Sequence, residues 1–326
     1  MPLKQIASPD AKYLAATDIL IGDMSDTNYE FLLYNRPIIL LANEWLRDNF
    51  ADIGIKTDVR GLESAIARSI ENPAEYSDAR NDWLKRTIYL HEENASPRVL
   101  DIAIERSGYL NPSIIIVHGE SEVRKSNLLP LYEEACRRNM NVEFLPWVHG
   151  KKYRDECIFF AVHFEDLKIQ MGYKVHLDHG LKGQGTANVE IAKIDYTENN
   201  FFPLINLHIT AGQVGDERTK MLLGPNSDRS VIGGYPKADY LKRDNTPEDR
   251  RAVFRELGFD ENIPLITYAP AGELSHAKPG GSLSPEVIES LQRLSKSHDY
   301  NILIKLKQAQ RPLYIRVLTK LRRLIP

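Results

Sequence analysis

The sequence of 326 residues contains only two cysteines, Cys136 and Cys157, and no long hydrophobic run. Two cysteines are too few for a disulfide framework and are typical of a reducing compartment. No apolar stretch approaches the ~20 residues that are needed to cross a bilayer. The opening segment MPLKQIASPDAKYL lacks the apolar centre of a secretory signal. We therefore expect a cytoplasmic protein that is soluble or attached peripherally to the inner face of the cell membrane.

Neither sign of charge is in large excess, because 42 Lys and Arg residues accompany 45 Asp and Glu residues, for a formal net charge of −3. This balance argues against a nucleic-acid partner, which usually requires a basic field. Basic residues do cluster locally, and we interpret the clusters as solvated faces, with peripheral contact to anionic lipid as the alternative. The clusters are Lys151, Lys152 and Arg154, and Lys320, Arg322 and Arg323.

Common metal and nucleotide motifs are missing as well. The nine histidines form no HxxxH pair, and no CxxC occurs. The nearest approach to a metal cluster is HLDH at residues 176–179, but we expect His176 to face the opposite side of its strand. No Walker A loop is present and no GxGxxG follows a strand, which argues against a P-loop ATPase or an NAD enzyme. We expect neither a metal nor a cofactor.

The residues that are present predict alternating strands and helices. Residues 16–41, ATDILIGDMSDTNYEFLLYNRPIILL, predict a buried strand at 19–21, a polar turn, a helix at 27–35 and a second buried strand at 37–41. The middle of the chain predicts strands at 112–119, 142–147 and 173–177 and helices at 126–139 and 156–170. The last third predicts helices at 247–257 and 285–296, strands at 264–270 and 300–306, and a final helix to Ile325. This alternation is typical of parallel sheets with helices on both faces.

The region between the first two groups of strands is rich in predicted helix. Residues 61–90 have apolar residues at helical spacing, interrupted at Asn72-Pro73. Residues 95–110 predict a further helix, which we expect to be capped near Ser96 with Pro97 at its first position.

The polar turn after the first strand is a candidate ligand site. Ser25, Asp26 and Thr27 lie where the predicted helix begins, and their side-chain oxygens can cap free N–H groups there. A helix N-terminus that follows a strand also attracts anions. Glu30 lies one turn further along, in position to accept hydrogen bonds from ribose hydroxyls. The pattern favours a nucleotide-diphosphate site, and the alternative is an ordinary capped turn.

A histidine in the segment HLDHGLKGQGT, residues 176–186, is a candidate general base. His179 follows the end of a predicted strand, where open α/β sheets place their ligands. An imidazole at that position can remove a proton from a hydroxyl near neutral pH. Gly180 and Gly183 permit close approach of the backbone to a substrate. His118, at the end of the strand at 112–119, competes for the same role, and a solvated surface loop is the alternative for His179.

Two further segments are weaker candidates, one for a hinge and one for phosphate binding. SVIGGYPKADYL, at 230–241, predicts a hinge that includes Gly234, Pro236 and Asp239. Residues 266–281 follow a strand with small residues that suit the approach of a phosphate. Lys305, at the end of the last strand, can meet a phosphate as a point charge, or it can face water.

Taken together, five segments resemble blocks of the CDP-glycerol glycerophosphotransferases, the teichoic-acid primases and polymerases. DILIGDMSDTNYEFLLYNRPIILL is similar to the family's D-x-L-I-T-D-Y-S-S-x-x-x-D-F-x-x-x-x-x-P block, and LDHGLKGQGT is similar to W-H-G-T-P-L-K. VIGGYPKADYL resembles G-x-P-R-N-D-x-L, ITYAP resembles L-Y-A-P-T, and ILIKLKQ resembles I-I-K-L-H-P.

The resemblance implies two Rossmann-like domains of GT-B type and the transfer of glycerol phosphate from CDP-glycerol to a hydroxyl of a lipid-linked or polymer acceptor, as in cell-wall teichoic-acid synthesis. It implies that His179 is the general base and that the turn at Ser25 holds the diphosphate. It also places Gly180, Lys182 and Gly183 on the acceptor side, and Lys305 and Lys307 near the phosphates.

The chain departs from the family pattern at several positions. Asp26 replaces the second serine of the D-Y-S-S block, which brings a negative charge to the expected diphosphate position. Repulsion between two such charges at ~4 Å is of order 4 kcal/mol in partly buried surroundings. Lys307 and Gln308 replace the histidine and proline of K-L-H-P. The arginine that follows A-P-T in the family is missing, and Ala271, Gly272 and Glu273 occupy that region.

The order of the blocks is permuted, since the block that resembles D-Y-S-S precedes all the others. The chain is therefore interpreted as circularly permuted or as a junction of two tandem modules. We expect residues 1–92 and 240–326 to form the second and first halves of one nucleotide-binding domain. Residues 93–112 are expected to be a crossing helix and linker, and residues 113–239 the acceptor-side domain.

The resulting hypothesis is a polyol-phosphate transferase with a nucleotide-diphosphate donor. A GT-B glycosyltransferase, or an enzyme like the nucleotide-sugar 2-epimerases, is an alternative in which Glu30 also has a role. The contrasting hypothesis is a catalytically degenerate binding module, which the departures at Asp26 and Lys307 favour.

Overall fold

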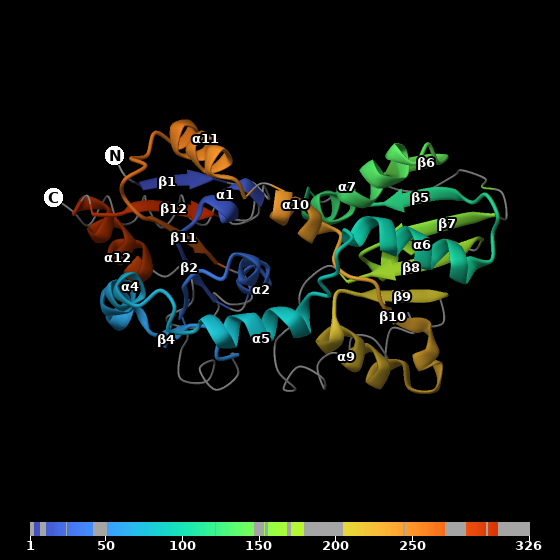
Figure 1. Cartoon of the computed structure of the whole chain (residues 1–326), viewed down its shortest axis with the longest axis horizontal. Helices are drawn as coiled ribbons and strands as arrows, with labels where there is room; N and C mark the ends of the chain where they lie inside the picture. Colours follow the sequence, from blue (N-terminus) through green and yellow to red (C-terminus); the bar gives the residue numbers. More distant parts are fainter. Residues whose placement is uncertain are drawn as a thin grey trace. The chain divides into compact units, whose positions relative to one another are not determined.

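The chain forms two compact units, each with its own sheet. Unit 1 comprises Met1–Trp83 and Arg243–Pro326, and unit 2 comprises Leu84–Lys242. Each unit contains a six-stranded sheet in which all the described strand pairings are parallel (Figure 1). The predicted α/β class with parallel sheets is therefore confirmed. This computed structural model describes residues 3–6, 11–23, 25–41, 51–120, 122–146, 153, 156–167, 171–178, 205–243, 245–270, 285–297 and 299–305.

The sheet of unit 1 combines strands from both ends of the chain in the order β1-β12-β11-β2-β3-β4. The strands are β1 Leu3–Ile6, β2 Ile19–Gly22, β3 Ile38–Leu41, β4 Ile55–Thr57, β11 Leu265–Ala269 and β12 Asn301–Lys305. The helical segments are α1 Ala11–Ala16, α2 Thr27–Phe31, η1 Leu32–Tyr34, η2 Val59–Gly61, α4 Leu62–Glu71, α5 Ser77–Thr87, α11 Pro247–Leu257 and α12 Pro285–Lys296. β2 pairs directly with β11, so the two chain ends share one sheet.

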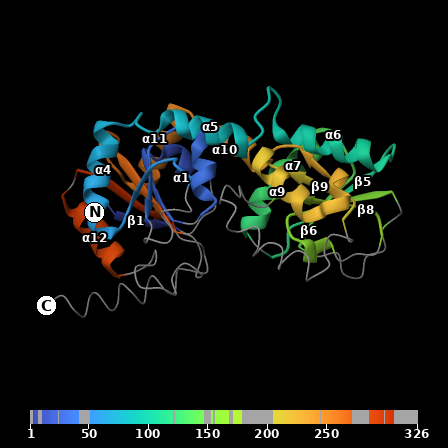
Figure 2. The ribbon, with the colours of Figure 1, turned by 90° about the horizontal axis from the view of Figure 1, so that it is seen from below.

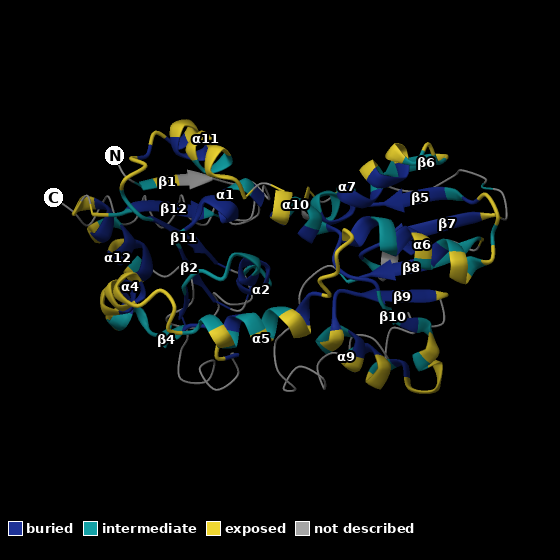
Figure 3. Cartoon of the chain, in the orientation of Figure 1, coloured by how far each residue is buried: buried dark blue, intermediate teal, exposed yellow. Residues whose placement is uncertain are grey.

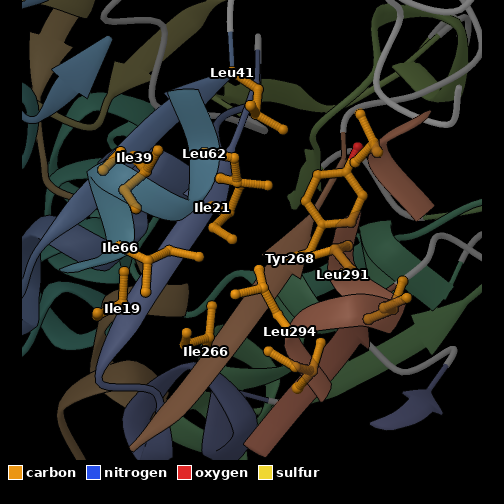
Figure 4. Close-up of a cluster of buried hydrophobic side chains, with 14 of the residues drawn as sticks. Ile19, Ile21, Ile39, Leu41, Leu62, Ile66, Ile266, Tyr268, Leu291 and Leu294 are labelled. Carbon is orange, nitrogen blue, oxygen red and sulfur yellow. The ribbon is translucent and has the colours of Figure 1, made fainter. Parts of the chain in front are cut away.

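Both faces of the sheet in unit 1 are buried, and successive side chains of its strands pack on opposite faces. Ile19 and Ile21 of β2, with Ile266 and Tyr268 of β11, pack against α4 and α12 on one face (Figure 4). The intervening residues Leu265 and Leu303 pack on the other face. The apolar residues of α1 and α11 that complete this second cluster are Tyr13, Ala16, Val253, Phe254 and Leu257. Successive side chains of a strand point to opposite faces, which explains the near-continuous apolar strand sequences.

The sheet of unit 2 has the order β10-β9-β8-β7-β5-β6. Its strands are β5 Ser113–Val117, β6 Val142–Leu145, β7 Cys157–Ala161, β8 Tyr173–Leu177, β9 Leu207–Thr210 and β10 Ser230–Ile232. Its helical segments are α6 Ala95–Ser107, α7 Glu122–Arg137, η3 Phe164–Leu167, α9 Gln213–Leu223, η6 Gly224–Arg229 and α10 Lys237–Arg243.

Both faces of the sheet in unit 2 are covered. Residues of α6 and α7 pack on one face against the side chains of Ile114, Ile158, Val175 and Ile209. The other face carries a second cluster that includes Val117, Phe159 and Ala161. Figure 2 shows α6, α7 and α9 within this unit from a second direction. Figure 3 shows the central strands as buried.

Several expectations about single elements were wrong. Residues 156–170 contain the strand β7 and the short helix η3 in place of the predicted helix. CIFFA is a continuous apolar run, which does not distinguish a buried strand from a buried helix. The predicted helix at 27–35 is shorter, since α2 ends at Phe31 and a 3-10 turn follows. The loop expected near residue 240 is the helix α10.

The N-terminus of α6 also differs from the prediction, and the difference concerns an expected hinge residue. The helix begins at Ala95 after Asn94, so Ser96 lies inside its first turn and is not its cap. The carboxylate of Asp239 accepts hydrogen bonds from the backbone N–H groups of Ala95, at 2.8 Å, and Ser96, at 2.9 Å. The Ser96 hydroxyl donates a third bond to it at 2.6 Å. Asp239 therefore caps α6 from a distant part of the sequence.

The chain passes between the two units twice. The chain leaves unit 1 within α5, after Trp83, where we expected a boundary after residue 92, and it returns after Lys242, where we expected residue 240. Among the helices that the structure describes, none is long and apolar enough to cross a membrane.

Candidate functional site

The carboxyl ends of β2 and β11 mark the point in unit 1 where the strand connections diverge. From β11 the chain continues to β12 on one side, whereas β2 continues to β3 and β4 on the other. Open α/β sheets bind their ligands beyond the carboxyl ends of the strands at such a switch point. The turn between β2 and α2, which contains Ser25, Asp26 and Thr27, lies at this position.

The β2–α2 turn is closed by a contact between Gly22 and Asn28. The Asn28 side chain is buried, and its Nδ2 donates to the backbone oxygen of Asp23 at 2.5 Å. A Cβ at Gly22 would lie 1.9 Å from Oδ1 of Asn28, so only glycine fits beneath this amide. Oδ1 is buried and has no hydrogen-bond partner within the described part of the chain. Asn28 was not identified from the sequence, although the pattern of a glycine followed six residues later by asparagine was available.

The cap of α2 differs from the predicted one. The N-cap residue Asp26 has helical backbone angles, φ −58° and ψ −22°, and makes no side-chain cap hydrogen bond. The Ser25 hydroxyl does accept from the N–H of Thr27, at 3.3 Å. Other N–H groups of the turn are also used internally: Ser25 N–H donates to Asp23 O, Asn28 N–H to Ser25 O, and the N–H groups of Tyr29 and Glu30 to Asp26 O. The turn therefore offers fewer N–H groups to a diphosphate than the sequence indicates.

The same turn carries acidic side chains. Glu30 is buried at 4% exposure, Asp23 is also buried, and Asp26 is half-buried. Carboxylates repel phosphate but accept hydrogen bonds from hydroxyl and amino groups. The environment therefore suits the ribose or base of a nucleotide better than its phosphates.

Lys305 lies at the same edge of the sheet as this turn. It is the last residue of β12 and follows Ile304, which pairs with Tyr268 of β11. The next residue of β11, Ala269, pairs with Gly22 at the end of β2, so Lys305 and Gly22 are level in the sheet. Two strand spacings separate β12 from β2, which places the two backbones about 10 Å apart. The structure thus brings Lys305 and the Ser25 turn together at one carboxyl edge, at a separation that suits two parts of one nucleotide.

Unit 2 has its own switch point, between β5 and β7. From β5 the chain passes to β6 on one side, and the later strands follow β7 on the other side. His118 directly follows β5 and is buried at 4% exposure. The centroid of its ring lies 4.5 Å from that of Phe144, and among the residues that the structure describes its buried Nδ1 has no hydrogen-bond partner. Burial lowers the pKa of His118, so the imidazole is neutral near pH 7 and its free nitrogen can accept a hydrogen bond.

An ion pair fixes the turn beside His118. Arg124, in the first turn of α7, donates to Asp166 at 3.0 Å, and the Asp166 side chain is completely buried. Gly119 has a φ of +59°, and a Cβ there would lie 2.7 Å from Nη1 of Arg124. Glycine therefore allows the turn to pass close to the guanidinium. Asp166 was not predicted, because it lies in the segment that we interpreted as a helix.

The segment expected to be a hinge belongs to unit 2. Gly234 has a φ of +97°, and its N–H donates to the backbone oxygen of Thr210 at 3.1 Å. Pro236 follows, and Asp239 caps α6 as described above. The chain returns to unit 1 after Lys242, beyond all three of these residues.

A buried polar cluster in unit 2 was not anticipated. His176 of β8 faces away from the α6–α7 side of the sheet, and its Nδ1 lies 3.0 Å from Nδ1 of His208 on β9. His208 in turn contacts Asp178 at 3.3 Å. Polar residues that alternate with apolar ones, HLD at the end of β8 and just beyond it and HIT in β9, are the signal that identifies this cluster. Within the described ranges, no group of three or more His, Cys, Asp or Glu residues is arranged to hold a metal ion.

The remaining predicted site residues lie outside the described residues. These are the general-base candidate His179, the acceptor-side residues Gly180, Lys182 and Gly183, and Lys307.

Replacement of His118 by leucine is expected to reduce the acid sensitivity of the protein. A lowered pKa in the folded state means that the unfolded chain binds the proton more tightly, so stability falls as the pH drops below about 6.5. The free energy of unfolding, measured in urea at pH 7.5 and 5.5, should fall less in His118→Leu than in the wild type, by up to about 1.4 kcal/mol for each pH unit.

The exposed His91 supplies the matched control, since His91→Leu should retain the pH dependence of the wild type. Identical pH dependence in His118→Leu and the wild type would show that His118 is not held neutral by burial.

No protein-family model matches the chain, and the comparison with curated proteins also gives no match. The site is therefore defined by its geometry and by the sequence blocks.

Proposed function

We propose that the chain is a transferase that uses a nucleotide-diphosphate donor of the CDP-glycerol type and moves a polyol phosphate to an acceptor hydroxyl. The observation that carries the proposal is the position of the Ser25 turn and Lys305 at the carboxyl edge of the sheet in unit 1. The five sequence blocks select the donor class, because they resemble those of the CDP-glycerol glycerophosphotransferases.

The strand order of unit 1 supports a permuted domain. When the strands are counted from β11 through the C-terminus and then on from the N-terminus, the order β1-β12-β11-β2-β3-β4 becomes 3-2-1-4-5-6. This is the order of dinucleotide-binding sheets. When the strands of unit 2 are numbered from β5 to β10 along the chain, their order in the sheet is 2-1-3-4-5-6. This order is typical of the other common type of doubly wound sheet. Two such domains are the parts of a GT-B enzyme, in agreement with a circular permutation or a junction of tandem modules.

Within unit 1, we assign the nucleoside to the acidic turn and the phosphates to the side of Lys305. Asp26 and Glu30 accept hydrogen bonds from ribose hydroxyls or a base amino group. The ammonium of Lys305 offsets phosphate charge as a point charge. This arrangement removes the conflict between Asp26 and a diphosphate, since the phosphates are not placed on the carboxylate.

Unit 2 supplies the acceptor side. His179 is the general base by resemblance, and it removes the proton from the acceptor hydroxyl as that oxygen attacks phosphorus. The neutral imidazole of His118 at the switch point provides a second acceptor for a hydroxyl hydrogen bond. Chemistry of this kind depends on the positioning of the two reactants and on fixed charges near the phosphate.

A binding module without turnover is the second candidate, because the N–H groups at the start of α2 are already bonded within the turn. A nucleotide-sugar glycosyltransferase, or an enzyme like the 2-epimerases, remains the alternative for the same nucleotide site, with Glu30 on the ribose. Calorimetry with CDP-glycerol, CDP and UDP distinguishes the three candidate functions. Preference for UDP favours an enzyme with a sugar donor, and binding of no nucleotide favours the inactive module.

Replacement of Lys305 by methionine is expected to weaken CDP binding about ten-fold and to leave cytidine binding unchanged, because the lysine meets only the phosphates. Isothermal titration of the full chain with CDP and with cytidine measures both affinities. Lys296→Met, at the exposed end of α12, is the matched control and should bind CDP as the wild type does. Equal CDP affinity in Lys305→Met and Lys296→Met would remove Lys305 from the site.

Replacement of His179 by alanine is expected to abolish turnover with CDP-glycerol and to leave nucleotide affinity nearly unchanged, because a general base acts on the acceptor and not on the nucleotide. Release of CMP in the presence of a polyol-phosphate acceptor measures turnover. Undiminished turnover in His179→Ala would transfer the base role to another residue, and the same assay on His118→Ala would show whether that residue is His118.

A further inference from the structure

The turn between β5 and α7 brings a buried imidazole to the start of a long helix. His118 directly follows β5, and its backbone N–H donates to Leu145 O at 2.9 Å, so it continues the pairing of β5 with β6. α7 begins shortly afterwards, at Glu122, and is 16 residues long. Ile114 and Ile116 of β5 pack on the side of the sheet that α6 and α7 cover. Because side chains alternate along a strand, His118 lies on the same side, under α7.

The surroundings of the His118 ring are aromatic and electrically balanced. The ring centroid lies 4.5 Å from that of Phe144, and Phe144 in turn contacts Tyr132 of α7 at 5.1 Å between centroids. The charged side chains that act on the imidazole are Glu122 and Lys125, both in the first turn of α7. Their charges are paired with each other, with 2.7 Å between Nζ and Oε1. The ring is therefore at the N-terminal turn of α7, beside an ion pair without net charge.

Nδ1 of His118 is a hydrogen-bonding atom whose partner is missing from the described part of the chain. Burial lowers the pKa of His118, so the ring is neutral at pH 8. A neutral imidazole with its proton on Nε2 has a lone pair on Nδ1, which can only accept. Buried polar atoms of native proteins are paired in the great majority of cases. The unmet lone pair therefore points to a donor that the chain does not supply.

The start of α7 adds an anion-binding element beside this lone pair. The first N–H groups of a helix have no partner within the helix, and the helix dipole favours negative charge there. The turn that leads into α7 is held close to the helix, because a Cβ at Gly119 would lie 2.7 Å from Nη1 of Arg124. Arg124 is itself fixed by the buried carboxylate of Asp166 at 3.0 Å. The N-terminus of α7 and the His118 ring are thus parts of one rigid turn.

A lone pair next to a helix N-terminus selects the class of ligand. The neutral Nδ1 accepts from a hydroxyl and gains nothing from an ionised oxygen, whereas the helix N-terminus attracts an oxyanion. A ligand that satisfies both carries a hydroxyl close to an oxyanion, as a hydroxyalkyl phosphate does. Inorganic phosphate or a plain polyol satisfies only one of the two. Glu120, exposed in the same turn, opposes the anion, so we expect an affinity of about millimolar.

We propose that the β5–α7 turn of unit 2 binds a hydroxyalkyl phosphate, with the ligand hydroxyl on Nδ1 of His118 and the phosphate at the first turn of α7. This turn lies at the switch point of the sheet in unit 2, where doubly wound sheets bind their ligands. The site depends on unit 2 alone. The identification of its ligand as the polyol-phosphate end of the acceptor rests on the proposed function.

The site is tested by NMR titration of the isotope-labelled full chain at pH 8 with glycerol 3-phosphate, inorganic phosphate and glycerol. We expect glycerol 3-phosphate to bind about ten-fold more tightly than inorganic phosphate, and glycerol to bind weakest. Both anions should shift the backbone amide signals of residues 122–125. Equal affinity for the two anions, or shifts confined to residues of unit 1, would overturn the site.

The imidazole itself gives an independent measurement in the wild type. Long-range 1H–15N spectra should show His118 as the Nε2–H tautomer, and the 15N signal of Nδ1 should move upfield with glycerol 3-phosphate but not with inorganic phosphate. An Nδ1–H tautomer, or a signal that does not respond to glycerol 3-phosphate, would overturn the contact with the hydroxyl.

Replacement of His118 by leucine separates the two parts of the site. His118→Leu should bind glycerol 3-phosphate about ten-fold more weakly than the wild type and inorganic phosphate equally well, which also shows that the turn is still folded. The exposed His91→Leu is the matched control and should bind both as the wild type does. Undiminished affinity of His118→Leu for glycerol 3-phosphate would overturn the role of His118.

The proposed function fails separately from this site. Absence of CDP binding or of turnover in the wild type would contradict the proposed function, whereas the titrations with glycerol 3-phosphate would still decide the site in unit 2. Absence of glycerol 3-phosphate binding would overturn this site, and CDP binding to unit 1 would be unaffected.

Discussion

The parallel pairing of β2 with β11 is the interaction on which unit 1 depends, because it joins strands that are more than two hundred residues apart in the chain. Its amino end is reinforced by Asp18, whose backbone N–H donates to Leu265 O while its carboxylate accepts from Leu265 N–H, each at 2.8 Å. Arg250 of α11 donates to the same carboxylate at 2.7 Å. Inside the sheet, the hydroxyls of Thr17 and Thr267 are 2.6 Å apart. The C-terminal strands β12 and β11 therefore lie inside the sheet, between the N-terminal strands β1 and β2.

The candidate nucleotide site is a consequence of this pairing. The switch point exists only where β2 and β11 lie side by side, and the Ser25 turn and Lys305 reach one edge only because their strands share the sheet. The close packing of the Asn28 amide on Gly22, with its hydrogen bond to the backbone oxygen of Asp23, then fixes the turn locally. Unit 2 is formed by one continuous stretch of chain. Its buried polar groups, His118 and the cluster of Asp178, His208 and His176, also lie near the carboxyl ends of strands.

The sequence predicts the fold class and most long elements, because parallel strands and amphipathic helices have distinct apolar spacing. The bounds of α11 and α12 agree with the predicted 247–257 and 285–296, since each begins at a proline. β7 was missed because five consecutive apolar residues have no period. The contact between His176 and His208 was missed because the two residues are far apart in the chain. The role of Asp239 as a cap depends on a contact across more than 140 residues. Long-range hydrogen bonds of this kind leave no local signal in one sequence.

A double-mutant cycle on Thr17 and Thr267 tests the central claim, that the two ends of the chain form one sheet. Both residues are completely buried, and since Thr17 donates to Tyr13 O at 2.7 Å, Thr267 must donate to Thr17. The free energies of unfolding of Thr17→Val, Thr267→Val and the double variant are compared with that of the wild type. If the hydroxyls are in contact, the double variant is less destabilised than the sum of the single variants, by about 0.5–3 kcal/mol. Additive effects would show that residues 17 and 267 do not meet, and the composite sheet would be contradicted.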